Sequence, residues 1–152
     1  MNKEDLLLTN IKNVHDKIVY LNKPVMESRL EGYTSTEIHC IEAIENSAQP
    51  NVSQIAQTLF MTRGAISKLT KKLIKKDAIS SYKNPDNKKE IYFKLTDKGR
   101  EAFNTHEQLH KEFKQRDAQV FNAITDNQYE AMMTFLNHYN THLEKEIHDK
   151  EK

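Results

Sequence analysis

The sequence predicts a mainly α-helical fold with a small β-wing, in which a winged helix-turn-helix module is bracketed by long N- and C-terminal helices. Three observations predict it. Apolar residues recur at helical spacing over most of the chain. Two short helical segments occupy residues 51–76, and a β-prone hairpin follows them. Only three Gly and three Pro occur in 152 residues, which favours helices joined by short connections.

The two short helices are expected on either side of a tight connection at residues 60–61. Asn51 is placed to cap the first helix, and Thr62 is placed to cap the second. The second helix is basic and keeps one apolar face, formed by Ile66, Leu69, Leu73 and Ile74. Two short helices joined by a few residues, the second of them basic, match the helix-turn-helix pattern.

A β-hairpin is predicted directly after the second helix. Residues 79–83 are β-prone, residues 84–87 (NPDN) are typical of a turn, and residues 90–95 (EIYFKL) return as a strand. Ile91, Phe93 and Leu95 alternate with more polar neighbours, which predicts that these three share the apolar face. A basic-tipped hairpin after a helix-turn-helix is a wing.

Positive charge is concentrated in this part of the chain. Residues 62–94 contain ten Lys or Arg against three acidic residues, a net charge of +7, whereas the whole chain carries +1. Such asymmetry is the electrostatic footprint of a nucleic-acid reader, although a solvated basic helix would show it too. Because the first turns of a recognition helix reach base edges, we expect contacts with double-stranded DNA there and along the wing. The candidate DNA-binding residues are Thr62, Arg63, Ser67, Lys68, Lys71, Lys72, Lys88 and Lys89.

Long amphipathic helices are expected on both sides of this module. Residues 3–30 carry a heptad-like stripe, and two further apolar stripes follow residue 96, with residues 125–127 (TDN) placed to cap the last helix. Either Ser35 or Thr36 is expected to cap the helix after the first. We therefore expect one domain, 1–152, with a DNA-binding part at 35–98 and dimerisation helices at 1–34 and 99–152. A homodimer would cover the surplus apolar surface.

The remaining composition excludes several classes. One cysteine rules out an intramolecular disulfide framework and suits a reducing cytoplasm. The N-terminus has no signal-peptide pattern, and no apolar run reaches the roughly 20 residues of a membrane span. Because no nucleophile motif, Gly-rich phosphate loop or paired-carboxylate spacing stands out, we expect no enzymatic activity. The non-enzymatic alternative from another class is a winged helix used only for protein contacts.

The chain resembles the MarR family of bacterial winged-helix repressors over nearly its whole length. The most specific parts are NVSQIAQTLFMTRGAISKLTKKLIKK and IYFKLTDKG. The resemblance implies a dimeric repressor on a palindromic operator, controlled by a small molecule, an oxidant or a metal. Asp77 stands where the family usually has Gly at the end of the recognition helix. In the wing, residues 87–89 (NKK) stand where the family often has Asp-x-Arg, so this chain lacks the Asp–Arg pair that usually braces the wing.

A histidine pair predicts a metal effector. His106 and His110 lie at i, i+4, so both imidazoles project from one helical face. The pair resembles the His-x-x-x-His of the zinc-uptake repressor branch of this family, and His39 matches that branch's third histidine. Three imidazoles and one carboxylate would form a tetrahedral Zn²⁺ site. The candidates for the fourth ligand are Glu27, Glu31, Glu37 and Glu107.

Two other effectors are considered. A phenolic or other small-molecule ligand could release the repressor from DNA by entering a pocket lined by Tyr20, Met26 and Tyr33, although these residues serve equally well as core. Oxidation of Cys40 is the second route. A lone helical cysteine is usually a small buried core residue, and nothing beside Cys40 in the sequence would lower its thiol pKa. No cofactor is expected to be required for the fold.

Overall fold

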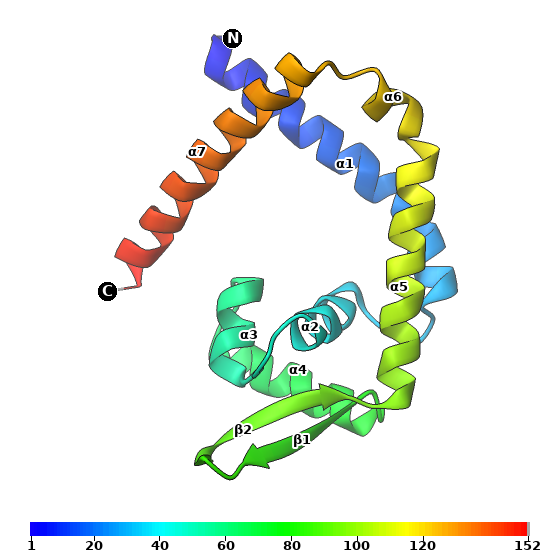
Figure 1. Cartoon of the computed structure of the whole chain (residues 1–152), viewed down its shortest axis with the longest axis vertical. Helices are drawn as coiled ribbons and strands as arrows, with labels where there is room; N and C mark the ends of the chain where they lie inside the picture. The colour runs from blue at the N-terminus through cyan, green and yellow to red at the C-terminus, as the bar shows by residue number, and fades with distance from the viewer. Residues whose placement is uncertain (152) are drawn as a thin grey trace. The chain divides into compact units, whose positions relative to one another are not determined.

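The computed structural model describes residues 1–151. Helices and one two-stranded antiparallel sheet follow one another along the chain as drawn in Figure 1, which confirms the predicted mainly α fold with a small wing. The chain divides into two compact units, one covering Met1–Glu112 and the other beginning at Phe113. None of the helices in the described part of the chain is long and apolar enough to cross a membrane.

The first unit contains the winged helix-turn-helix. Its elements are α1 (Lys3–Arg29), α2 (Ser35–Glu45), α3 (Val52–Leu59), α4 (Arg63–Lys75), β1 (Ile79–Asn84), β2 (Asn87–Leu95) and most of α5 (Asp97–Arg116). Helix α2 is central, since it contacts α3, α4 and β2, while α4 also packs on α3 and β1. The core includes aliphatic side chains of α2, α3, α4, β1 and α5, among them Ile38, Ile41, Ile55, Ile66, Leu73, Ile79 and Leu109.

Side-chain caps set where the helices begin. Thr62 accepts a hydrogen bond from the Ala65 amide at 3.1 Å, as predicted for the start of α4. Helix α2 begins differently from the expectation, because Thr34, one residue before the expected caps, forms a capping box with Glu37. Glu37 determines where α2 begins, since its side chain accepts a hydrogen bond from the Thr34 amide at 2.8 Å.

The hairpin is longer than predicted, and its burial departs from simple alternation. Ile79 pairs with Leu95, and Tyr82 pairs with Tyr92. Tyr92 and Phe93 are both buried, whereas Ile91 is 48% exposed, so the expectation of an inward Ile91 is wrong. The Tyr82 ring lies 5.7 Å from that of Tyr92 and helps to cover the second face of the hairpin. Burial does not alternate between Tyr92 and Phe93 because both faces of this small sheet are covered there.

Helix α1 leaves its apolar stripe exposed. None of its side chains is buried. Large apolar side chains with more than a third of their surface exposed recur along it, namely Leu7, Ile11, Val14, Ile18, Leu21 and Val25. These are the positions of the predicted heptad-like stripe, so α1 presents an apolar surface that the described part of the chain does not cover.

The second unit contains α6 (Ala118–Asn122) and α7 (Asp126–Lys150). The predicted cap is confirmed, since Thr125 forms a capping box with Gln128 at the start of α7. No side chain of α7 is buried. Its exposed apolar side chains include Met132, Phe135, Leu136, Leu143 and Ile147. This helix therefore also presents apolar surface that the described residues of its own unit do not cover.

Candidate functional site

The exposed face of α4 carries the predicted DNA-binding side chains. Ile66, Leu69, Thr70 and Leu73 turn into the core, which directs the opposite face outward. Arg63 and Lys68 are exposed and Ser67 is half-buried. Lys71 and Lys72 are also exposed, one turn further along. The hydroxyl of Thr62 is engaged as the cap, but the residue itself is exposed at the helix entry.

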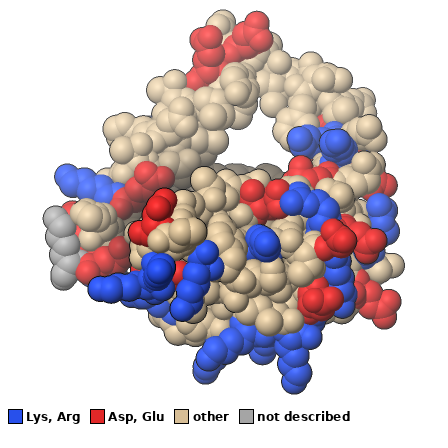
Figure 2. Space-filling model, turned by 60° about the horizontal axis from the view of Figure 1, so that its bottom comes forward, with Lys and Arg blue, Asp and Glu red and all other residues tan. Residues whose placement is uncertain are grey.

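The wing tip carries Lys88 and Lys89, both fully outside the core. Short side-chain contacts shape the tip. Asn84 Oδ1 accepts the Asp86 amide at 3.0 Å, and Asn87 Oδ1 accepts the Lys89 amide at 3.3 Å. Asn87 therefore provides local support at the place where the MarR pattern usually has an acidic residue. Figure 2 shows Lys and Arg side chains gathered along the lower edge of the face that it turns toward the reader.

A cluster of metal-ligating groups joins α2 to α5. Ligand atoms of Glu42, His106 and His110 all lie within 4.8 Å of one another. The Nε2 atoms of His106 and His110 are 3.0 Å apart, and Nδ1 of His106 is 3.2 Å from Oε2 of Glu42. The His39 ring lies 6.5 Å from that of His106. The structure thus brings His106 and His110 together with a carboxylate, while His39 lies outside this group of ligand atoms.

The electrostatics of His106 favour the neutral imidazole that metals bind. The side chain is only 2% exposed. Burial lowers the pKa of His106, and the nearby His110 lowers it further, while Glu42 opposes both in part. Although Nδ1 lies near Glu42, it makes no hydrogen bond and is one of few buried polar atoms in the described chain without one. A carboxylate beside one imidazole nitrogen orients the ring for metal binding through the other nitrogen, which here is Nε2.

The carboxylates considered from the sequence lie in other surroundings. Glu37 binds Lys76, and Glu27 makes a 3.9 Å surface contact with Lys23. Glu31 and Glu107 are exposed, and Glu107 is close enough to influence the pKa of His106. Glu42, which the sequence reasoning missed, occupies the cluster instead. Its spacing of three residues after His39 on one helix was the available signal.

Cys40 is fully buried. Burial raises the pKa of its thiol to about 12, and the negative charge of Glu37 adds to the effect. Because the thiolate is the reactive form, this environment argues against the oxidation-sensing alternative.

A small cavity lies between α2 and α3, beside the cluster. Its volume is about 150 Å³, and its lining includes His39, Glu42 and Gln54. Pockets for drug-sized ligands usually start near 300 Å³. Of the residues considered for a phenolic pocket, Tyr20 is 80% exposed and Tyr33 lies against Lys76. The lining of this cavity contains none of Tyr20, Met26 and Tyr33.

The helix-turn-helix with its basic outer face and its wing defines a DNA-binding protein of the winged-helix class. The sequence model of the MarR family matches residues 33–91. The HTH-type transcriptional regulator PchR of Bacillus subtilis is 31% identical, with 95% of this chain and 94% of PchR covered. The chain therefore belongs to the MarR family, and it is a DNA-binding transcriptional regulator rather than an enzyme.

Solved structures show the same fold. FabT of Streptococcus pneumoniae, in complex with DNA, aligns with a TM-score of 0.77 at 19% identity, covering 95% of this chain and 99% of FabT. MarR of Staphylococcus aureus, in complex with salicylate and kanamycin, aligns with a TM-score of 0.75 at 16% identity, covering 94% and 93%. At these identities the likeness concerns the fold alone.

Proposed function

We propose that this MarR-family regulator is a homodimeric repressor of a palindromic operator and that Zn²⁺ strengthens its binding to that operator. Residues 35–98 form the DNA-binding part, and the helices on either side, 1–34 and 99–152, form the dimer. The observation that carries the effector assignment is that ligand atoms of Glu42, His106 and His110 lie within 4.8 Å of one another.

The dimer is supported by apolar surface on the long helices. Ile11, Val14 and Ile18 on α1 are each more than 40% exposed, as are Leu136 and Leu143 on α7. Exposed apolar stripes of this length are costly in water and are typical of protein–protein interfaces. A second copy of the chain would present the same stripes, which is the condition for a two-fold symmetric interface.

In the proposed complex α4 enters the major groove as the recognition helix. Arg63, Ser67 and Lys68 read base edges, and Thr62 adds a phosphate contact to its capping role. Lys71 and Lys72 lie one turn away and contact phosphates. Lys88 and Lys89 reach the backbone or the minor groove from the wing. A two-fold symmetric dimer would present two recognition helices to two half-sites about one helical turn apart.

The donor set of the cluster fits zinc. Two imidazole nitrogens bound to one tetrahedral Zn²⁺ lie roughly 3.3 Å apart, and the Nε2 atoms of His106 and His110 are 3.0 Å apart. Glu42 is the carboxylate of the cluster, and the His39 ring lies 6.5 Å from that of His106. Because His39 and Glu42 belong to α2 and the other two to α5, a bound ion would join the DNA-binding part to the long helix that follows it.

Zinc titration of chelator-treated protein, with operator affinity measured in parallel, tests the proposal. We expect stoichiometric zinc binding and at least a tenfold gain in operator affinity. His106→Ala and Glu42→Ala should remove both effects. His148→Ala is the matched control, since His148 is exposed near the end of α7 and lies outside the cluster. A reporter gene behind the operator should be silenced by zinc in cells with the wild-type protein only.

Either of two results would contradict the effector assignment. Operator affinity that is the same with and without zinc would leave a DNA-binding regulator with another effector. Zinc binding that survives His106→Ala would place the metal elsewhere on the protein. The dimer is tested separately, because sedimentation in the absence of metal reports the oligomeric state directly.

A further inference from the structure

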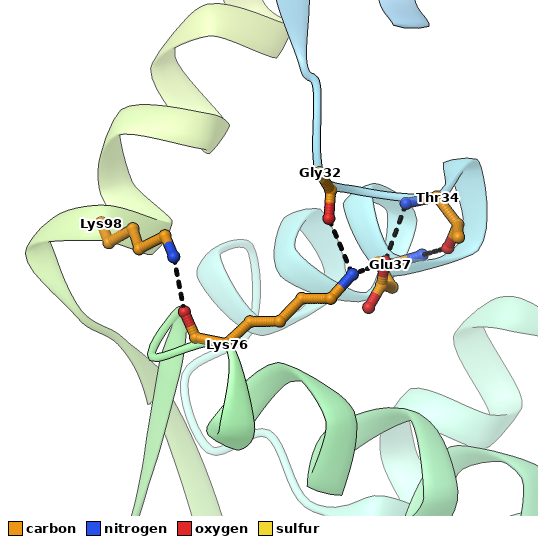
Figure 3. Close-up of polar contacts among 5 residues, drawn as sticks. All are labelled: Gly32, Thr34, Glu37, Lys76 and Lys98. Carbon is orange, nitrogen blue, oxygen red and sulfur yellow. Dashed lines mark hydrogen bonds and ion pairs between the residues drawn. The ribbon is translucent and has the colours of Figure 1, made fainter.

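The C-terminal end of the recognition helix is held from two sides (Figure 3). The ammonium group of Lys76 donates to the carbonyl oxygen of Gly32 at 2.7 Å and to Oε1 of Glu37 at 2.7 Å. Lys98 Nζ donates to the carbonyl oxygen of Lys76 at 2.8 Å. Lys76 thereby links the end of α4 to α2 and to the segment between α1 and α2, while Lys98 links it to the start of α5.

Glu37 is an ionised carboxylate inside the protein. It is 2% exposed. Burial, the largest influence, raises its pKa, but hydrogen bonds from Lys76 and Thr34 outweigh this and leave the pKa of Glu37 below its usual value. A buried carboxylate depends on its partner, because removing one member of such a pair leaves an uncompensated charge. The positive charge of Lys76 is therefore needed to neutralise the buried Glu37 carboxylate.

The ion pair with Glu37 distinguishes Lys76 from its basic neighbours on α4. Lys72 and Lys75 are exposed on the same helix, whereas Lys76 is half-buried and its charge is balanced by Glu37. The Tyr33 ring lies 5.7 Å from its ammonium group. In the sequence, Lys76 is one of the ten Lys and Arg residues of the basic segment 62–94. The structure shows it bound to groups of its own chain.

The segment that Lys76 holds is a glycine turn. Gly32 has φ of +95°, a conformation that residues with a side chain rarely adopt. The space around its Cα is open, so packing against a Cβ position does not restrain it. The hydrogen bond from Lys76 to the Gly32 carbonyl therefore restrains the turn between α1, which carries the exposed apolar stripe, and the DNA-binding part.

We propose that the Lys76–Glu37 pair is a positioning element that sets the separation of the two recognition helices, and hence how strictly the protein selects the spacing of operator half-sites. The inference rests on the proposed homodimer through α1. One inserted base pair moves a half-site by roughly 3.4 Å along the duplex and turns it by roughly 35°. Only a dimer whose recognition helices are held at a fixed separation rejects such a change.

The test uses the full-length dimer and a palindrome selected from a random library, with spacers shortened by one base pair or lengthened by one or two. The wild type should lose at least tenfold in affinity for each altered spacer. Lys76→Met and Glu37→Gln should bind the whole series within about threefold of one another. Lys76→Arg, which keeps the positive charge and the donors, should restore discrimination.

Lys72→Met is the matched control. It should weaken binding to every spacer equally and reduce the slope of log affinity against log salt by about one, as loss of a phosphate contact does. Lys76→Met should leave that slope unchanged. A slope reduced by one in Lys76→Met would make Lys76 a DNA contact and overturn the proposal.

Absence of the homodimer and absence of the spacing role would give different experimental results. A monomeric wild type would remove the proposed homodimer and the spacing role with it. A dimeric wild type whose folded Lys76→Met and Glu37→Gln variants keep the tenfold discrimination would overturn the positioning role alone. Circular dichroism melts of both variants identify any that does not fold, and Glu37→Gln, which nearly preserves shape, keeps the test available if Lys76→Met is too unstable.

Discussion

Gly99, in the first turn of α5, lies directly against the carbonyl oxygen of Ala78, so that a Cβ at position 99 would overlap this backbone atom. The same carbonyl accepts the Thr96 amide at 3.1 Å, and Thr96 Oγ1 accepts the Gly99 amide at 3.1 Å. The end of α4 and the start of α5 are thus joined backbone to backbone. The contact between Gly99 and Ala78 determines the direction in which α5, the helix of His106, continues from the wing.

Gly99→Ala should therefore lower the free energy of unfolding by about 1–3 kcal/mol, as overpacking does elsewhere. Gly64→Ala is the control. Gly64 lies in α4 with nothing near its Cβ position, so alanine should stabilise the helix by about 0.5–1 kcal/mol. Chemical denaturation of both variants measures the difference. Equal stability of the two would contradict the close approach.

Phe60 should be replaceable by glycine with a gain in stability. It ends α3 in a left-handed conformation (φ 53°) and is 72% exposed, so its ring contributes little packing. For a residue with a side chain this conformation costs about 1 kcal/mol. We expect Phe60→Gly to raise the free energy of unfolding by about that amount. Asp77→Gly, at φ 62°, should gain less because Asp tolerates this region better. A fall in stability on Phe60→Gly would mean that the ring packs in solution.

Arg63 and Lys89 should differ in the kind of DNA binding that they support. Arg63→Ala should weaken binding to the selected operator by about 1–3 kcal/mol, with little effect on random DNA. Lys89→Ala should weaken binding to both and reduce the salt slope, as expected for a wing contact to the backbone. Titrations on operator and random duplexes at several salt concentrations measure this. Equal loss on both duplexes for Arg63→Ala would remove it from the base-reading set.

A charge on the α1 stripe should disrupt the dimer. Ile18→Glu places a carboxylate in the exposed apolar row, and we expect monomers or insoluble protein, measured by analytical ultracentrifugation. Lys12→Glu, on the opposite side of α1, changes charge without touching the row and should leave the oligomeric state unchanged. Dimers in both variants would place the interface elsewhere.

Cys40 should be inert in the folded protein. Because its thiol is fully buried and its pKa is raised to about 12 by burial, a thiol reagent at pH 8 should label the native protein at least a hundredfold more slowly than the denatured protein. Cys40→Ala should bind DNA as the wild type does before and after peroxide treatment. Fast labelling of native protein would reopen the oxidation-sensing alternative.

Much of the fold was predictable because its signals are local. The helical repeat, the caps at Thr62 and Thr125 and the turn after β1 each depend on neighbours within a few residues along the chain. Asp77, which stands where the MarR family usually has Gly, takes the left-handed conformation. Burial in the hairpin was less predictable. Tyr92 is buried because Tyr82 covers it from the partner strand, and a periodicity of two cannot report that contact.

The same distinction between local and long-range signals applies to the candidate sites. By itself the sequence determined the winged helix-turn-helix, its basic face and the His106–His110 pair, since each lies within one element or between adjacent ones. Only the tertiary structure decided that Glu42 meets His106 and that Lys76 binds Glu37 instead of facing solvent. Both contacts join residues far apart in the chain, and they form only when α2 packs against its neighbours. Hydrophobic burial drives that packing. The local sequence pattern does not indicate which polar side chains the packing brings together.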